Sequence, residues 1–333
     1  MVIEKRMLIR FIDFLTPLLQ FLPPEVAHKF ALLSLKILSL IGLISSSEDQ
    51  KPKTLLGLEF KNMIGLAAGL DKNGDYIDAL CCLGFGFLEI GTVTPRPQKG
   101  NSKPRLFRIK KDLALLNKMG FNNKGVDHLV KKLKKSDLGC VLGISIGKNA
   151  DTPNEKALDD YLHCLKKVYE FADYIAINIS SPNTENLRDL QSEDNLTLLL
   201  KGLVKERRSL QENFGYKPLL VKVSPNLSSE NINSISEVIK SQEVDGLICS
   251  NTSNDHSFEP KGAGLSGLPI LEISNLVLSE FRSILGKDFP IIASGGVMDK
   301  ESYESKILSG ADLVQIYTGI IYKGPGLIQR LND

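Results

Sequence analysis

The chain has little of what metal-binding and disulfide-stabilised proteins are built from. Its five cysteines are an odd number, and no two of them form a C-x-x-C pair. Its four histidines are few as well, and no two lie at the spacing of metal ligands. We therefore expect reduced, mostly buried thiols in a protein that faces the cytosol, and neither a zinc nor an iron site.

Strong net charge is missing too. The formal net charge is +2, and no stripe of Lys and Arg with interleaved aromatic residues is present. These features argue against a nucleic-acid-binding protein. Apolar residues make up 42% and charged residues 24% of the sequence, which are values of a globular protein. A length of 333 residues suits an α/β barrel with an extension.

The first fifty residues are dense in Leu, Ile and Phe, yet no 18-residue run among them is free of charged residues and proline. A transmembrane helix is therefore not expected. A cleaved signal peptide is a weak alternative, because no small-residue cleavage site follows a clean apolar core. We predict two short helices over residues 5–21 and 25–42, hinged at Pro23 and Pro24. This extension, residues 1–50, precedes a second unit at 54–333.

The two predicted helices carry more apolar side chains than one buried face needs, as the run from Leu32 to Ile41 illustrates. One interpretation is a helical hairpin that packs on the larger domain. The other is an anchor of residues 1–45 that lies in the headgroup layer of a membrane and admits an apolar ligand. The sequence leaves both open.

After residue 54, short runs rich in Ile, Val and Leu alternate with helical segments such as 154–171 and 192–213. Strands are predicted at 62–68, 87–91, 141–146, 174–179, 219–224, 246–250, 290–294 and 312–317. Eight βα units predict a closed (β/α)8 TIM barrel of the α/β class. An open doubly wound sheet is disfavoured because no G-x-G-x-x-G follows the first strand. The non-helical insert 92–118 resembles a β-hairpin and is a candidate lid.

Polar residues follow these strands at the end where barrel enzymes carry their active sites. Turn chemistry explains any one of these loops, but it does not explain why amides and lysines recur at the same end. A lysine inside a buried strand also needs an anion or a dipole as partner. We therefore predict a site at this rim from Lys72, Asn178, Asn183, Lys222 and Asn251.

Two glycine-containing stretches, SGG (294–296) and YTG (317–319), close the seventh and eighth strands. In barrels these two loops often form a phosphate cup from backbone N–H groups. Gly295 and Gly296 allow a close approach, and Thr318 adds a hydroxyl. A phosphorylated cofactor held there lays its reactive ring near Lys222, and a lysine beside an isoalloxazine stabilises the anionic reduced flavin.

The stretch INISSPNT (177–184) ends the fourth strand with two serines. A hydrolase nucleophile at Ser180 or Ser181 needs a histidine base, and only His256, several residues after the sixth strand, is a candidate. No G-x-S-x-G is present either. A serine without histidine still accepts an acidic proton when water or a hydrogen-bond chain relays it. The stretch therefore points to carbon-acid chemistry coupled to hydride transfer.

Several long motifs resemble the dihydroorotate dehydrogenase family from about residue 55 onwards. They include GLAAGLDKNG, EIGTVTPRPQKGNSKPRLFR, NKMGFNNKGVDHL, YIAINISSPNTENLRDLQ and GADLVQIYTGIIYKGPGLI. The serine at the proton-accepting position and the apolar N-terminal helices resemble the membrane-associated, quinone-dependent class. The soluble class carries a cysteine at that position and lacks the extension.

The resemblance implies an enzyme that oxidises (S)-dihydroorotate to orotate in pyrimidine synthesis with one FMN per chain. Ser181 would remove the C5 proton, the C6 hydride would pass to flavin N5, and a membrane quinone would reoxidise the flavin. It further implies a monomeric peripheral protein on the cytoplasmic face of the bacterial inner membrane.

The resemblance also assigns residues to each ligand. For FMN they are Ala68, Gly69, Leu70, Asp71, Lys72, Thr92, Ser145, Asn178, Lys222, Ser250, Gly267, Gly296, Tyr317 and Thr318. For the substrate they are Lys72, Asn117, Lys118, Met119, Gly120, Phe121, Asn178, Asn183, Asn251 and Thr252. For the quinone they are His28, Arg108 and Tyr317. Two positions depart from the pattern, because Ser145 stands where relatives have asparagine and Ser250 where they often have threonine.

Three alternatives stay open at this point. One is another FMN barrel oxidoreductase, acting on a related ring or linked to fumarate or NAD. A second is a flavin-free lyase or isomerase that uses Lys72 or Lys222 as a Schiff base. A third is a non-catalytic membrane-binding module.

Overall fold

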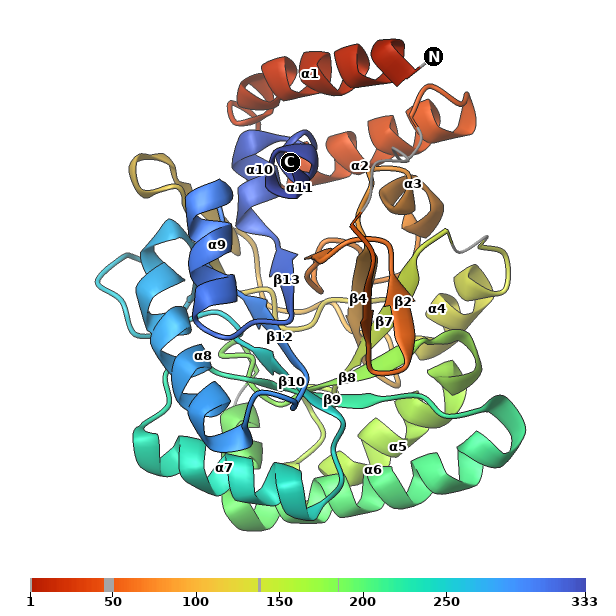
Figure 1. The fold of residues 1–333 in the computed structure, drawn as a ribbon, viewed down its shortest axis with the longest axis vertical. Coiled ribbons are helices and arrows are strands. Elements are labelled where there is room, and N and C mark those ends of the chain that lie inside the picture. The colour runs from red at the N-terminus through yellow and green to blue at the C-terminus, as the bar shows by residue number, and fades with distance from the viewer. Residues whose placement is uncertain (1, 45–50, 137–138, 185) are drawn as a thin grey trace.

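A closed barrel of eight parallel strands forms the centre of the molecule (Figure 1). The structure is a computed structural model that describes residues 2–44, 51–136, 139–184 and 186–333. Around the barrel the strands are β3 (Ile64–Leu66), β4 (Phe87–Val93), β7 (Val141–Ile146), β8 (Tyr174–Asn178), β9 (Leu219–Val223), β10 (Gly246–Cys249), β12 (Ile291–Ser294) and β13 (Leu313–Ile316). Pairing of β13 with β3 closes the ring. The predicted TIM barrel is confirmed, with every strand within two residues of its expected bounds.

Helices surround the barrel (Figure 1). In chain order they are α3 (Ile77–Cys81), α4 (Val126–Leu133), α5 (Ala157–Val168), α6 (Glu193–Phe214), α7 (Ser229–Ser241), α8 (Leu271–Leu285), α9 (Lys300–Leu308), α10 (Thr318–Lys323) and α11 (Leu327–Asn332). Short 3-10 turns lie at 110–112, 154–156, 169–171, 187–191 and 268–270. Local sequence sets several helix starts: the Ser228 side chain accepts from the Asn231 N–H, and Asp299 forms a capping box with Ser302.

A hairpin closes the N-terminal end of the barrel. Its strands are β1 (Lys53–Leu55) and β2 (Leu58–Phe60). Phe60 packs edge-on against Phe87, the first residue of β4, with ring centroids 5.3 Å apart. Tyr174 and Leu313, which begin β8 and β13, belong to the same fully buried cluster. Because this end is filled by apolar side chains, a ligand can enter the barrel only from the opposite end.

The insert after β4 contains the expected hairpin, formed by β5 (Leu106–Ile109) and β6 (Ala114–Asn117). A third strand, β11 (Gly264–Gly267), pairs with β6 and was not predicted. It comes from the loop that follows β10, about 150 residues further along the chain. The small sheet β5–β6–β11 thereby ties two distant loops together beside the mouth of the barrel.

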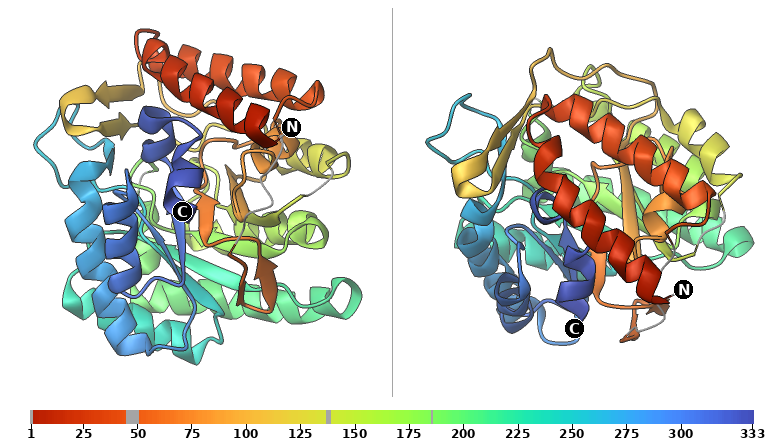
Figure 2. Two further views of the ribbon diagram at one scale, coloured as in Figure 1. Left: turned by 45° about the horizontal axis from the view of Figure 1, so that its top comes forward. Right: turned by 90° about the horizontal axis from the view of Figure 1, so that it is seen from above.

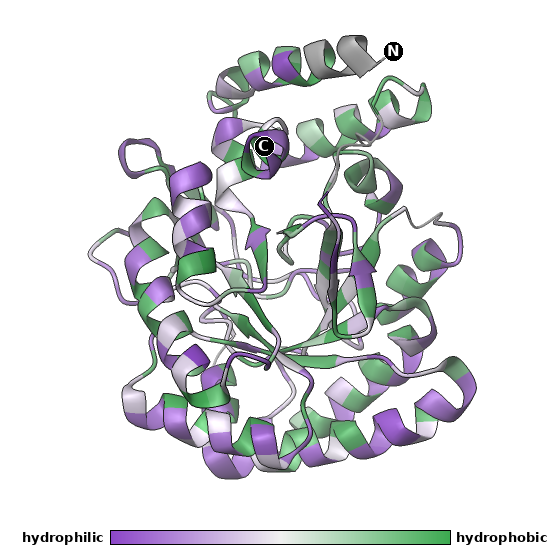
Figure 3. Cartoon of the chain, viewed as in Figure 1, coloured by the Kyte–Doolittle hydropathy of each residue, from purple (hydrophilic) through white to green (hydrophobic). Residues whose placement is uncertain are grey.

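The two N-terminal helices lie over the C-terminal end of the barrel (Figures 1 and 2). They are α1 (Val2–Leu19) and α2 (Pro24–Leu40), close to the predicted ranges. Helix α1 packs on α10, and α2 packs on α3 and β5. Large apolar side chains face solvent on α1 and on the turn that follows it, with Phe14 76% and Phe21 80% exposed. Figure 3 shows apolar residues interleaved with polar ones along α2 and the coloured part of α1. In the described ranges, no helix has the length and apolarity needed to cross a bilayer.

Candidate active site

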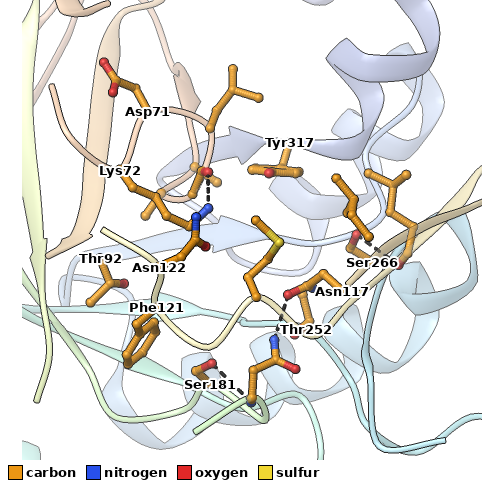
Figure 4. Close-up of a pocket in the computed structure, with 18 of the residues that line it drawn as sticks. Asp71, Lys72, Thr92, Asn117, Phe121, Asn122, Ser181, Thr252, Ser266 and Tyr317 are labelled. Atoms are coloured by element: carbon orange, nitrogen blue, oxygen red, sulfur yellow. Dashed lines mark hydrogen bonds between the residues drawn. The ribbon is translucent and has the colours of Figure 1, made fainter. Parts of the chain in front are cut away.

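A cavity of about 780 Å³ occupies the C-terminal mouth of the barrel. Its floor is formed by the ends of the barrel strands, one wall by the small sheet and the segment 117–124, and its roof by α2 (Figure 4 shows part of the lining). Residues of α2 that line it include Glu25, His28, Leu32 and Leu33. The cavity therefore reaches from the centre of the barrel to the N-terminal extension.

Most of the predicted site residues meet in this one cavity. The residues that line it are Ala68, Gly69, Leu70, Asp71, Lys72, Thr92, Asn117, Met119, Gly120, Phe121, Asn178, Ser181, Asn183, Lys222, Ser250, Asn251, Thr252, Gly267, Gly296, Tyr317, Thr318 and His28. Apart from His28 of α2, they come from the carboxyl-terminal parts of the barrel strands other than β7 and from the loops that follow those strands, as expected for parallel strands. The lining does not include Ser145, Lys118 or Arg108.

Ser145 and Lys118 instead support residues of the lining. Ser145 is fully buried, and its Oγ is 2.9 Å from Thr92 Oγ1. Thr92 Oγ1 also accepts a hydrogen bond of 2.7 Å from Asn178 Nδ2. Ser145 thus supports Thr92 and, through it, Asn178. Lys118 donates its backbone N–H to the Arg105 carbonyl at 2.8 Å, which fixes the start of the segment 117–124.

Arg108 connects β5 to the turn between the N-terminal helices. Its guanidinium donates to the carbonyls of Leu22 at 2.7 Å, Gln20 at 3.4 Å and Leu19 at 3.5 Å. Its partly buried setting lowers its pKa. Arg108 thus holds the turn that follows α1, and it places a cation near the C-terminus of that helix, where the helix dipole favours one. In this structure Arg108 therefore fixes the N-terminal extension rather than facing the cavity.

The two serines of the stretch 177–184 have different surroundings. Ser181, 6% exposed, lines the cavity, and its Oγ accepts a hydrogen bond of 3.3 Å from the Asn183 N–H. Ser180 is fully buried; its Oγ donates to the Lys222 carbonyl at 2.6 Å and accepts from Asn251 Nδ2 at 3.1 Å. Ser180, which had no role in the sequence, thus joins the ends of β8, β9 and β10.

Four of the asparagines that line the cavity together with Ser181 are hydrogen-bonded in pairs. Asn183 Nδ2 donates to Asn117 Oδ1 at 2.7 Å (Figure 4), and Asn251 Nδ2 lies 3.2 Å from Asn178 Oδ1. His256, the candidate base for a serine nucleophile, is not among the residues that line the cavity, and its ring bonds the Ala263 carbonyl at 2.8 Å. Among the described residues, those that bond to one another beside Ser181 are amides.

The loop after β3 is organised by Asp71. Its buried carboxylate accepts backbone N–H bonds from Asn73, Asp75 and Tyr76, while burial raises its pKa. The loop places Lys72 at the cavity, where Nζ donates to the Gly69 carbonyl at 2.7 Å (Figure 4). Burial, and next the charge of Arg105, lowers the pKa of Lys72 to about 8. This lysine is thus held as a partly desolvated cation, ready for an anionic ligand.

Lys222 has a carboxylate partner that the sequence reading missed. Its Nζ lies 3.1 Å from Oε1 of Glu89, a buried residue of β4 inside the barrel. Glu89 Oε2 also accepts from Gln315 Nε2 at 2.7 Å and from the Tyr174 hydroxyl at 3.2 Å. A Schiff-base lysine must present a free amine to its substrate. Lys222 is instead held in a buried ion pair inside the barrel.

The glycines of the predicted phosphate cup have the expected backbone freedom. Gly295 has φ +112° and Gly296 has φ +88°. A Cβ on Gly296 would lie 2.5 Å from the Cα of Leu271, and one on Gly267 would lie 2.2 Å from the Leu113 carbonyl oxygen. The Thr318 hydroxyl donates to Ser266 Oγ at 2.8 Å beside them. Only glycine fits where these backbones approach one another.

The roof of the cavity adds groups that the sequence reading did not single out. They are Glu25 and Arg105, which pair with each other, and Tyr76. His28 also faces this part of the cavity, and burial together with the nearby charge of Lys72 lowers its pKa to about 4. Tyr317 lines the cavity from the barrel side, and burial raises its pKa to about 12. Both rings are therefore neutral at pH 7.

Comparison with known proteins agrees with this geometry. The family model described as dihydroorotate dehydrogenase matches residues 52–333. The chain belongs to the dihydroorotate dehydrogenase family. A relative named dihydroorotate dehydrogenase (quinone) from Acinetobacter baylyi is 52% identical over 321 residues, which cover 94% of this chain and 96% of that protein. Its counterpart from Cellvibrio japonicus is 50% identical, with 92% and 93% covered. The resemblance to the quinone-dependent members is confirmed.

Solved structures of the family have the same fold. A dihydroorotate dehydrogenase from Eimeria tenella, determined in complex with ferulenol, superposes with a TM-score of 0.86 at 37% identity. The match covers 93% of this chain and 90% of that chain. A ligand-free structure of the Eimeria enzyme gives a TM-score of 0.84 with the same identity. The matched part of this chain is longer than the barrel unit, so it includes residues of the N-terminal extension.

Proposed function

We propose that this protein oxidises dihydroorotate to orotate, with FMN as bound cofactor and a membrane quinone as the final electron acceptor. The observation that carries the proposal is the continuity of the cavity. One space is lined by Ser181 and its asparagines, by Lys222, by the Gly296 loop and by His28 on α2. A reaction with two half-reactions needs its oxidant, its substrate and its second acceptor in such a connected space.

The residues present fit a flavin phosphate. Gly267 and Gly296 keep a positive-φ backbone at the cavity, where its N–H groups would bind an anion, and Thr318 supplies a hydroxyl. In the described part of the chain, three buried side-chain oxygens at the cavity lack a hydrogen-bond partner: Asn122 Oδ1, Asn183 Oδ1 and Gln315 Oε1. The flavin ring and the substrate ring both carry N–H groups that would satisfy these acceptors. When bound, the flavin supplies a two-electron acceptor beside the Lys222 cation.

The amides and Lys72 would hold the substrate. Dihydroorotate carries a carboxylate, which the Lys72 ammonium can pair with, and imide groups that asparagine side chains recognise with both donor and acceptor atoms. Asn117, Asn178, Asn183 and Asn251 line one side of the cavity. Because these amides already bond one another, they are oriented before the substrate arrives.

Ser181 would accept the proton from C5 of the substrate at its Oγ. This proton is acidic because it lies next to a carbonyl, so a serine relayed by hydrogen-bonded water suffices without histidine. The Asn183 N–H donates to the same oxygen and so favours its negatively charged form. Its near-complete burial keeps bulk water from competing for the proton.

The exposed apolar faces of α1 and α2 would bind the membrane surface as a peripheral anchor. Phe14 of α1 and Phe21 of the turn between the helices project into solvent, while Leu32 and Leu33 of α2 line the roof of the cavity below. An amphipathic pair of helices lies in the headgroup layer and brings a lipid-soluble quinone to the cavity. Substituting Phe14 and Phe21 by glutamate should abolish binding to lipid vesicles and leave flavin reduction in solution intact; unchanged vesicle binding would refute the anchor.

The reaction itself is tested by following flavin absorbance after mixing with dihydroorotate. In Ser181→Ala the reduction rate should fall roughly a hundred- to ten-thousand-fold, the usual contribution of a positioned base. The FMN content should stay the same, because Ser181 is assigned no contact with the cofactor. A purified wild-type protein without a flavin spectrum, or a Ser181→Ala variant that is reduced at the wild-type rate, would overturn the proposal.

A further inference from the structure

Lys306 on α9 is a fully buried cation that the proposed reaction does not use. Its side chain has no exposed surface. Among the residues that the structure describes, no carboxylate forms an ion pair with it, and its Nζ donates to the hydroxyl of Ser274. A buried charge without a counter-ion is costly, so such a lysine points to an anion that is bound from outside the chain.

The contacts of Ser274 lead from Lys306 to the cavity. Ser274 lies in the first turn of α8 and is also fully buried. Its Oγ is within 3.3 Å of the Gly295 carbonyl and 2.9 Å of the Leu271 carbonyl. Gly295 and Gly296 belong to the cavity lining, and the backbone of Gly296 packs against Leu271. Lys306 therefore stands directly behind the glycine loop, on the side away from the cavity.

We propose that Lys306 is a positioning residue for the phosphate of the flavin cofactor, acting through Ser274 on the Gly295–Gly296 loop. The proposal rests on the proposed binding of FMN. The buried ammonium makes the potential at the loop more positive without touching the ligand, and it holds the loop through a short chain of hydrogen bonds. In the low-dielectric interior such a charge acts over a longer distance than at the surface.

The neighbouring groups do not supply the missing negative charge. The thiol of Cys249 is near Lys306, but burial raises its pKa to about 12, so it is neutral at pH 7. Burial lowers the pKa of Lys306 to about 8, which still leaves the ammonium form predominant at pH 7. A phosphate dianion on the far side of the loop would favour the charged form further.

The test compares two flavins that differ in the phosphate. The protein is freed of its flavin and titrated with FMN and with riboflavin, and binding is followed by quenching of flavin fluorescence. In Lys306→Met the affinity for FMN should fall roughly tenfold or more, the scale of one charge-assisted interaction. The affinity for riboflavin should not change. Lys300→Met, a less buried lysine of the same helix, is the control and should alter neither affinity.

Each outcome decides between a positioning role and a structural one. An equal loss for FMN and riboflavin, or no loss for either, overturns the inference. If Lys306→Met does not fold, Ser274→Ala breaks the same chain of contacts and should lower the ratio of FMN to riboflavin affinity in the same direction; an unchanged ratio in that variant is equally decisive against it. A wild-type protein that binds no FMN would instead refute the proposed function.

Discussion

Arg105 donates two hydrogen bonds to the carboxylate of Glu25 in α2, from Nε to Oε1 at 3.1 Å and from Nη2 to Oε2 at 3.2 Å. Arg105 is almost completely buried, and its Nη1 also donates to the carbonyls of Lys99 and Asn101. The N-terminal extension is therefore attached to the wall of the cavity by a forked ion pair, the geometry in which such pairs are strongest. This contact links the position of α2 to the shape of the cavity roof.

Glu25→Gln should loosen α2 while leaving the barrel folded. The substitution leaves the buried Arg105 cation with a neutral partner, which costs roughly 1–3 kcal/mol. We expect faster amide hydrogen exchange in residues 24–40 and slower quinone reduction, with unchanged reduction of the flavin by dihydroorotate. Glu59→Gln, which removes an exposed carboxylate of β2, is the control. Equal protection of residues 24–40 in both variants would contradict this function of the ion pair.

Glu89→Gln should destabilise the protein far more than loss of a surface ion pair. Lys222 and Glu89 are both buried, so the variant leaves an uncompensated ammonium inside the barrel at a cost of roughly 3–5 kcal/mol. The exposed pair of Arg208 and Glu243 provides the comparison, and Glu243→Gln should cost about 1 kcal/mol or less. Urea unfolding of both variants gives the two values. A similar, small loss in each would mean that Lys222 does not depend on Glu89.

Gly296→Ala should impair flavin binding beyond what backbone strain explains. The new Cβ would meet the Leu271 Cα at 2.5 Å, and overpacking of this kind costs roughly 1–3 kcal/mol. Gly286 has nearly the same φ, +86°, and open space around its Cβ position, so Gly286→Ala carries the strain without the crowding. We expect FMN release only from the Gly296 variant, measured as the flavin-to-protein absorbance ratio. Equal flavin content in the two variants would argue against a phosphate cup there.

The sequence was sufficient for the barrel because each strand is a short, continuous apolar run that stays buried on both faces. It was also sufficient for the rim residues, because parallel strands bring their carboxyl ends together. Contacts between residues far apart in the sequence could not be predicted. Glu89 lies 133 residues before Lys222 and looked like one more strand residue, and β11 is a four-residue stretch that becomes a strand only by pairing with β6.

The resemblance predicted which residues lie near the site, but it did not predict the direction in which their side chains point. Arg108 matched a position expected at the quinone site, yet its guanidinium binds the turn that follows α1, and Arg105 and Glu25 line the cavity instead. Likewise Ser145, expected to contact the cofactor, lies behind Thr92. The direction in which a long side chain points depends on which acceptors the neighbouring segments present to it, and a motif does not contain that information.

His28 should make the stability of the protein sensitive to mild acid. Its pKa in the folded protein is about 4, against an ordinary 6.5, because the ring is buried and faces Lys72 and Lys29, with Glu25 only partly opposing them. A base whose pKa is lowered by folding takes up a proton more readily in the unfolded chain. Stability is therefore unaffected above about pH 6.5 and falls as the pH drops from 6.5 towards 4.

Between pH 7 and pH 5 this one group should remove roughly 2 kcal/mol from the free energy of unfolding. His28→Asn, which cannot be protonated, should lose that part of the pH dependence, whereas His163→Asn, at an exposed position of α5, should retain it. Urea unfolding of the three proteins at the two pH values measures the difference. If His28→Asn keeps the wild-type pH dependence, the ring is protonated in the folded protein, and a neutral imidazole at the cavity roof is excluded.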